Sequence, residues 1–189
     1  TNLTQDHLDF HKTMEEYRKA KAMLFSISDK GVINLDDNAA QAMLADAKCP
    51  CLTFSCEKDA ADLTAKNIHL HADGVEFVAT TKGELARVKL PIPGHFSVEN
   101  ALAALGMVLQ IGMSLSDAAH SLATATGVKG RVEVVPTDTD YTVLIDYAHT
   151  PDGVENVLRA VRGFAKGRVI ALFGCGGDRD RTKRPKMGK

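Results

Sequence analysis

Residues 31–55 read GVINLDDNAAQAMLADAKCPCLTFS and place a helix-like segment between two short apolar runs. The runs 31–35 and 51–55 are bounded by turn-forming residues, which is typical of short buried strands. Between them, the polar residues 36–38 can cap a helix over residues 39–45. This strand–helix–strand alternation predicts an α/β domain in which helices cover a parallel sheet.

The next segment has a strand pattern of another kind. Apolar and polar residues alternate in three runs separated by turns, residues 67–71, 75–79 and 86–90. Such alternation is typical of an antiparallel meander with one face toward water. His69 and His71 share one face of the first run. They could form a metal pair, but exposed strand histidines are the commoner interpretation.

Two helices are predicted after the meander. Ser97 can cap a helix from residue 98 to about residue 111, and Gly112 can end it. Asn100 would then lie in the first turn, where its amide can reach a ligand at the helix N-terminus. The alternative is an exposed amide without a ligand. Ser114, with an acidic residue three positions later, opens a second helix to about residue 123.

A domain boundary is predicted at residues 127–130, where two glycines lie within four residues and the composition changes. A new βαβ pattern begins at Arg131. Residues 132–135 start a strand, residues 141–146 form a full strand, and residues 168–174 are predicted to form the next one.

The helix between these strands has clear signals. Thr150 can cap it and Pro151 suits its first position. Its predicted buried stripe consists of Val154, Val157, Leu158 and Val161. Ligands in such folds gather at the carboxyl ends of strands, which makes Asp146 and His149 candidate site residues.

The C-terminal segment 174–189 reads GCGGDRDRTKRPKMGK and carries a surplus of positive charge. Its glycines let backbone amides approach an anion, and its arginines can clamp a carboxylate or phosphate. The phosphate-binding P-loop pattern occurs nowhere in the sequence, and the segment does not match the dinucleotide fingerprint because position 179 is Arg. A solvated basic loop is the alternative interpretation.

The first 25 residues carry a helical pattern with a lysine in an unusual place. Met14, Tyr17, Lys21, Leu24 and Phe25 fall on one face at helical spacing. Two interpretations stay open for the lysine. It either extends to water at the helix edge, or it is buried and becomes a neutral, nucleophilic amine.

Just before this helix, acidic and histidine residues are crowded together at Asp6, His7, Asp9 and His11. Oxygen and imidazole ligands of this kind suit Mg²⁺ or Mn²⁺. An acidic helix start is the other interpretation.

The composition excludes several classes of protein. A net charge of −1 argues against a general nucleic-acid or membrane-surface binder. No apolar run approaches the roughly 20 residues that span a bilayer. The four cysteines lack paired Cys-x-x-Cys arms, so reduced cytosolic thiols are expected. Because the chain starts without Met and stops within a basic motif, we expect a fragment cut at both ends.

Taken together, four stretches resemble the Mur ligases, and within them the members that add the third amino acid to UDP-N-acetylmuramoyl-L-alanyl-D-glutamate. These stretches are TNLTQDHLDFH at residues 1–11, the helix at 17–25, DYAHTP at 146–151 and GCGGDRD with KRP at 174–185. The resemblance implies that residues 1–126 are the later part of a central ATP-binding domain, with a parallel sheet, helices and a small antiparallel meander. Residues 127–130 would be the hinge. Residues 131–189 would open a Rossmann-like C-terminal domain with its first βαβ unit.

The resemblance also implies roles for individual residues. Lys21 matches a carbamylated lysine that, with His7, holds a Mg²⁺ ion at the γ-phosphate of ATP. Asn100 matches a residue near the adenine, and Arg131 an arginine that contacts phosphate. Asp146 matches the ribose-binding aspartate, and His149 lies in the same loop and would line the nucleotide. Arg179 matches the arginine that binds the carboxylate of the added amino acid.

The implied reaction is an ATP-dependent amide synthesis through an acyl phosphate. The amine of meso-diaminopimelate or L-lysine would attack the activated D-glutamyl carboxylate during cell-wall precursor synthesis. A cytoplasmic monomer that binds no nucleic acid and inserts into no membrane is expected.

Two rival functions remain: a folylpolyglutamate synthase-like ligase and a non-catalytic nucleotide-binding fragment. The long glycine–arginine motif favours the cell-wall enzymes. The family's phosphate loop would lie before Thr1, so we expect the chain itself to have no ligase activity.

Overall fold

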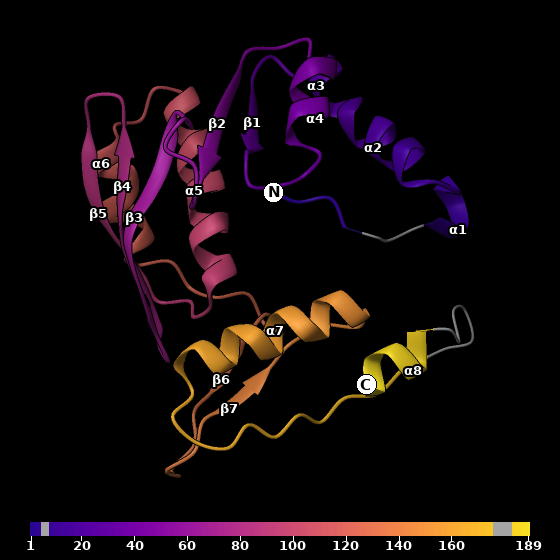
Figure 1. Cartoon of the computed structure of the whole chain (residues 1–189). Coiled ribbons are helices and arrows are strands. Elements are labelled where there is room, and N and C mark those ends of the chain that lie inside the picture. Colours follow the sequence, from indigo (N-terminus) through magenta and orange to yellow (C-terminus); the bar gives the residue numbers. More distant parts are fainter. Residues whose placement is uncertain (5–7, 176–182) are drawn as a thin grey trace.

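A computed structural model describes residues 1–4, 8–175 and 183–189 (Figure 1). Its main sheet has five strands in the order β1-β2-β3-β4-β5. The strands are β1 Gly31–Asn34, β2 Cys51–Ser55, β3 Leu63–His71, β4 Gly74–Thr81 and β5 Leu85–Leu90. The first three strands are parallel and the last two are antiparallel to their neighbours. The predicted parallel sheet and the predicted meander are therefore halves of one mixed sheet.

The two halves meet at a short junction. Strands β2 and β3 pair through only two residue pairs, Phe54 with Leu63 and Ser55 with Thr64. Beyond the junction, β5 alternates exposed and buried residues along its whole length. The meander therefore has one face in the core and one in water, as its sequence predicts.

Two helices cover the core face of the sheet, α5 His95–Gln110 and α6 Leu115–Leu122. The fully buried side chains that fill this interface include Phe54, Phe77, Leu102, Leu105 and Leu115. Helix α5 approaches the parallel strands closely at Gly106. A Cβ atom there would lie 2.8 Å from Val32 Cγ1 and 3.2 Å from Leu52 Cδ2.

The start of α5 differs from the prediction. The helix begins at His95, and Gly94 is its N-cap with a φ of 97°, a left-handed conformation that glycine adopts without a steric penalty. Ser97 is therefore not the cap: it lies inside the helix, is buried, and its hydroxyl donates to the Pro93 carbonyl at 2.8 Å. Asn100 consequently lies in the second turn, not the first. The predicted stop at Gly112, with a φ of 95°, and the predicted Ser114 cap are confirmed.

Helix α4, Ala40–Asp46, lies between β1 and β2 as predicted, but its N-cap is Ala39. The acidic residues before it have other partners. Asp36 accepts hydrogen bonds from the Ser55 hydroxyl and from the backbone N–H of Cys56. Asp37 accepts from the N–H groups of Leu3 and Ala39, both at 2.7 Å. These carboxylates tie the ends of β1 and β2 to the N-terminal segment.

The N-terminal helical pattern forms three short helices, α1 Leu8–His11, α2 Met14–Ala22 and α3 Leu24–Ile27. The predicted continuous helix is broken at Met23, so residues beyond it leave the face that Tyr17 occupies. Tyr17 is buried, whereas Leu24 is 58% exposed. The single apolar stripe predicted from residue 14 to residue 25 was therefore wrong.

The C-terminal part contains β6 Glu133–Val135, β7 Val143–Ile145, α7 Pro151–Phe164 and α8 Lys183–Gly188. Strands β6 and β7 form an antiparallel pair. Thr150 caps α7 and Pro151 opens it, as predicted. The side chains predicted to form the buried stripe of α7 are each only half-buried: Val154, Val157, Leu158 and Val161.

No strand forms over residues 168–174, although the structure describes all of them, so that prediction was wrong here. A strand needs a neighbouring backbone to pair with. Leu172 is fully exposed and Ile170 is 76% exposed.

The α/β fold class is otherwise confirmed. Within the described ranges, no helix has both the length and the apolar character needed to cross a membrane.

Candidate functional site

A cavity of about 1050 Å³ lies between the start of α5, the loop after β7 and one face of α7. Four of the residues predicted from the sequence line it: Asn100, Arg131, Asp146 and His149. They come from separate elements, since Asn100 lies on α5, Arg131 precedes β6, and the other two follow β7. The structure thus brings together the residues that the sequence assigned to one nucleotide site.

Asp146 anchors the wall on the β7 side. Its Oδ2 accepts from the backbone N–H of Val132 at 2.8 Å, and its Oδ1 accepts from that of Ala148 at 2.7 Å. A carboxylate oxygen has two lone pairs, so each oxygen can still accept from a ligand hydroxyl. Asp146 is half-buried, which keeps it fixed in place and within reach of the cavity.

The residue held by Asp146 has an unusual backbone. Val132 has a φ of 46° and is buried. A β-branched residue rarely adopts this left-handed conformation, which costs on the order of 1–3 kcal/mol and is concentrated at functional sites. The hydrogen bond from its N–H to Asp146 helps to maintain that strained geometry beside the cavity.

An aromatic side chain joins two of the predicted residues. The Arg131 guanidinium lies 5.2 Å from the ring centroid of Tyr147, a cation–π distance. His149 Nδ1 is 3.0 Å from the Tyr147 carbonyl oxygen, and the two rings meet edge to face at 5.1 Å. Tyr147 also lines the cavity. Sequence reasoning missed it, although its position between Asp146 and His149 was an available signal.

A histidine–carboxylate pair forms part of the α5 wall. His95 Nδ1 lies 3.6 Å from Glu99 Oε1, and both residues line the cavity. The neighbouring Glu99 carboxylate raises the pKa of His95, partial burial opposes this, and the charges of Glu57 and Asp36 add to the increase. A protonated His95 would place a positive charge at the edge of the cavity. The sequence analysis did not single out this pair.

Apolar side chains form the remaining wall. Leu70 and Leu90, from the ends of β3 and β5, line the cavity together with Val157 and Ala160 of α7. This surface suits a flat apolar group such as a nucleobase. Together with Arg131 and the Asp146 carboxylate, it provides the three kinds of contact that a nucleotide needs.

Lys21 lies elsewhere. It is on α2, is exposed, and its Nζ is 5.4 Å from the Tyr17 ring centroid. The buried-amine interpretation was therefore wrong for this structure, and the interpretation that the lysine extends to water holds. His7 and Arg179 lie outside the described residues. The predicted roles of all three remain predictions.

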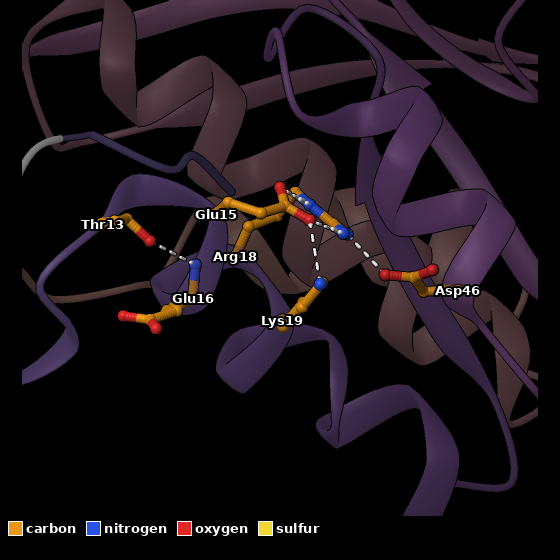
Figure 2. A network of polar contacts seen from close by, with 6 residues as sticks. All are labelled: Thr13, Glu15, Glu16, Arg18, Lys19 and Asp46. Carbon is orange, nitrogen blue, oxygen red and sulfur yellow. Dashed lines mark hydrogen bonds and ion pairs between the residues drawn. The ribbon is translucent and has the colours of Figure 1, made fainter.

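Ion pairs among Glu15, Arg18 and Lys19 of α2 and Asp46 of α4 hold α2 in place (Figure 2). Arg18 bonds Glu15 at 2.8 Å and Asp46 of α4 at 2.5 Å, and its side chain is only 12% exposed. Its hydrogen bond lowers the pKa of Glu15 to about 2. Lys19 also pairs with Glu15, at 3.7 Å. This network fixes the direction of α2 relative to α4, so the Lys21 backbone has a defined position.

Among the residues that the structure describes, no three acidic, histidine or cysteine side chains are grouped so as to hold a metal ion. His69 and His71 are both exposed on β3, which agrees with the commoner interpretation of that pair.

Comparison with known proteins finds relatives over the whole length of the chain. Residues 1–108 match the Mur ligase middle domain, and residues 130–189 match the Mur ligase glutamate ligase domain. A UDP-N-acetylmuramoyl-L-alanyl-D-glutamate–2,6-diaminopimelate ligase of Clostridium botulinum is 48% identical over 191 residues. That alignment covers 100% of this chain and 39% of the relative.

Solved structures agree with this. The structure of a ligase with the same name is 37% identical with a TM-score of 0.76, and the match covers 99% of this chain and 39% of that one. An L. casei FPGS structure is 20% identical with a TM-score of 0.68, covering 89% of this chain and 42% of that one, which shows a shared fold alone. The chain thus spans about two fifths of the length of the relatives it matches.

Proposed function

The chain belongs to the Mur ligase family, and on that basis we propose that it is part of an ATP-dependent ligase that joins 2,6-diaminopimelate to UDP-N-acetylmuramoyl-L-alanyl-D-glutamate. The observation that carries the proposal is the 48% identity, over all of this chain, to a relative that bears this name. The same name recurs in the solved structure at 37% identity. Diaminopimelate is therefore favoured over lysine as the added amino acid.

The cavity is the proposed ATP site. Asp146 would accept a ribose hydroxyl through the free lone pairs of its carboxylate. Arg131 would bind a phosphate, for which a guanidinium fork is well suited. Asn100 and the apolar wall would contact the base, and His149 would line the nucleotide. The geometry supports this assignment because these four side chains converge on one space from separate elements.

The second proposed centre lies at α2. There, Lys21 in its N6-carboxylated form and His7 would hold Mg²⁺, which would neutralise phosphate charge. An unmodified ammonium has no acceptor atom, so Lys21 fits this role only after carboxylation. Its exposed amine is accessible to CO₂. Arg179 would bind the carboxylate of the incoming amino acid.

The domain division is also proposed: a central domain at 1–126, a hinge at 127–130 and a C-terminal domain from 131. Because the cavity is lined from both sides of the hinge, movement at Gly127 and Gly130 would open or close it. We further propose a cytoplasmic monomer whose partners are its small-molecule substrates, with no nucleic acid and no membrane insertion.

Assays of phosphate release test the activity. The full-length parent should release phosphate only when ATP, the UDP-linked dipeptide and diaminopimelate are all present, and replacing diaminopimelate with lysine should reduce the rate strongly. Turnover with a folate and glutamate instead would favour the folylpolyglutamate synthase alternative. The 189-residue chain alone should release none, and measurable turnover by it would contradict that part of the proposal.

Two variants of the full-length parent test the assigned residues. Lys21→Ala should abolish its activity, and added short carboxylic acids should partly restore it. Arg131→Ala should raise the KM for ATP. Near-normal turnover of Lys21→Ala would show that the lysine is no metal ligand.

A further inference from the structure

Two cysteines flank Pro50 where the chain enters β2. The Cys51 thiol donates to the Cys49 carbonyl oxygen at 3.4 Å. Both side chains are half-buried, so small reagents can reach them. They lie at the amino end of β2 and line neither the candidate nucleotide cavity nor its walls.

The pair lies at a junction of three segments. The backbone N–H of Gly31, which opens β1, donates to the Pro50 carbonyl at 2.9 Å. A Cβ atom at Gly31 would lie 2.7 Å from Cys51 Sγ and 2.7 Å from the Phe25 ring. The N–H of Lys48 donates to the Phe25 carbonyl at 3.3 Å. The Cys51 sulfur therefore fills the space where Phe25 of α3 meets the first two strands.

The spacing of the two cysteines allows them to be joined. Cys49 lies in a bend just before β2, and the Cys51 side chain turns back toward it, since the Cys51 sulfur is 3.4 Å from the Cys49 carbonyl oxygen. Their Cα atoms can be at most about 7 Å apart, which is close to the upper end of the range for disulfides. A bridge would need a small backbone adjustment, and a strained, accessible disulfide is readily reduced again. The pair therefore suits a reversible bond better than a permanent one.

We propose that Cys49 and Cys51 form a redox-responsive dithiol that closes to an intramolecular disulfide when the protein meets a low-molecular-weight disulfide such as oxidised glutathione. The Cys49 thiolate attacks one sulfur of the oxidant, whose S–S bond breaks and releases one glutathione thiolate. The Cys51 thiol then gives up its proton as it attacks the Cys49 sulfur of the mixed disulfide, and the second glutathione leaves as a thiol that has taken up a proton. Two protons and two electrons pass from the protein to the oxidant.

The order of attack follows from the surroundings of each sulfur. Burial raises the pKa of the Cys51 thiol to about 11, so Cys51 is protonated at neutral pH and is the resolving thiol. Once the mixed disulfide has formed, its sulfur is held next to Cys51, and the second step is intramolecular and favoured by proximity. Cys51 Sγ fits closely beside Gly31 and Phe25, so we expect a change in its direction on closure to loosen the contact between α3 and β1.

Cys56 lies just past the other end of β2, outside the pair, and burial raises the pKa of its thiol to about 12, so it is the matched control.

Mass spectrometry with thiol alkylation tests the proposal. The reduced chain, with its four cysteines, is incubated with oxidised glutathione at neutral pH and quenched with an alkylating agent. We expect a mass about 2 Da lower before alkylation, two fewer alkylated thiols, and a bridged peptide that contains residues 49–51. Hydrogen exchange of the amides at residues 25–31 should become faster after oxidation.

Single-site variants complete the test. Cys56→Ser should close as the unaltered chain does, whereas Cys51→Ser should retain a bound glutathione on Cys49. Closure in Cys49→Ser or in Cys51→Ser would overturn the proposal, as would four alkylatable thiols in the unaltered chain after oxidation. Because serine is close in size to cysteine, a circular dichroism spectrum equal to that of the unaltered chain confirms that each variant is folded.

Discussion

At the scale of single residues, Asp146 holds two segments of backbone at the edge of the cavity. Replacing it with Ala leaves the N–H groups of Val132 and Ala148 without their acceptor. We expect Asp146→Ala to lose about 1–2 kcal/mol of unfolding free energy and to abolish ATP binding. Urea unfolding and calorimetric titration with ATP measure the two effects. Asp152→Ala, at the exposed start of α7, is the control and should leave ATP binding unchanged.

The His95–Glu99 pair predicts a pH dependence. Because the folded state raises the pKa of His95 above its ordinary value, the stability that the pair contributes is fully present below the unfolded pKa. That contribution is lost as the pH rises through the folded pKa. Glu99→Gln should therefore lower the pKa of His95, which NMR titration of its ring protons can follow.

A matched control is Glu155→Gln, which removes an exposed carboxylate from α7. If both variants change the pKa of His95, or if neither does, the pairing with Glu99 is not the cause of the raised pKa.

Sequence reasoning at this scale depended on recognising motifs, because no periodicity identifies a ribose or phosphate contact. Asn100, Asp146 and His149 were candidates from their places in predicted elements, the resemblance added Arg131 and gave all four their roles, and the structure placed them around one cavity. Tyr147 and the His95–Glu99 pair were missed because their importance depends on distances between side chains. For Lys21 the sequence pattern left an exposed and a buried interpretation open, and the structure has the exposed one.

At the scale of elements, the approach of α5 to the sheet depends on Gly106. Alanine there gains about 1 kcal/mol of helix propensity but must push aside Val32 and Leu52, whose atoms would lie 2.8 and 3.2 Å from its Cβ. Val32 is β-branched and adjusts poorly. We therefore expect Gly106→Ala to lower the free energy of unfolding by a net amount of about 1–2 kcal/mol, which is the usual cost of overpacking.

Gly163→Ala in α7 is the comparison, because its Cβ would touch only Leu70, at an ordinary 3.5 Å. Gly163→Ala should raise the free energy of unfolding by up to about 1 kcal/mol. Thermal and urea unfolding of both variants decide the question, and equal effects in the two would contradict the close-packing argument.

The strands of the main sheet were predictable because their local signals agree with the fold. Alternating and continuous apolar runs gave β1, β2, β4 and β5 almost to the residue. The junction was not predictable, because residues 63–66 carry no pattern that says they pair with β2. Residues 168–174 show the opposite case: an apolar run has strand propensity, but without a paired neighbour it remains irregular and exposed.

At the scale of the whole molecule, the cavity connects two parts that different family domains match. If ATP binds there, hydrogen exchange should slow on both sides, in the first two turns of α5 and in the loop at residues 146–150. Binding should also raise the melting temperature, because a ligand that binds only the folded state stabilises it. Protection on one side alone would show that the two walls do not act as one site.

Arg131→Ala should weaken this protection from hydrogen exchange, while Arg159→Ala, which loses an exposed ion pair with Glu155, should weaken it less.

The two-pair junction between β2 and β3 has a consequence for how the chain reaches its native state. Strands β3, β4 and β5 follow one another through the short connections 72–73 and 82–84, so their contacts are local and close at little entropic cost. The meander should therefore assemble early, and the parallel strands should dock onto it late, because their registration requires α4 and α5 to be in place. A newly made chain would pass through a half-built sheet whose β3 edge is briefly open, and this is the stage at which it is most exposed to misassembly.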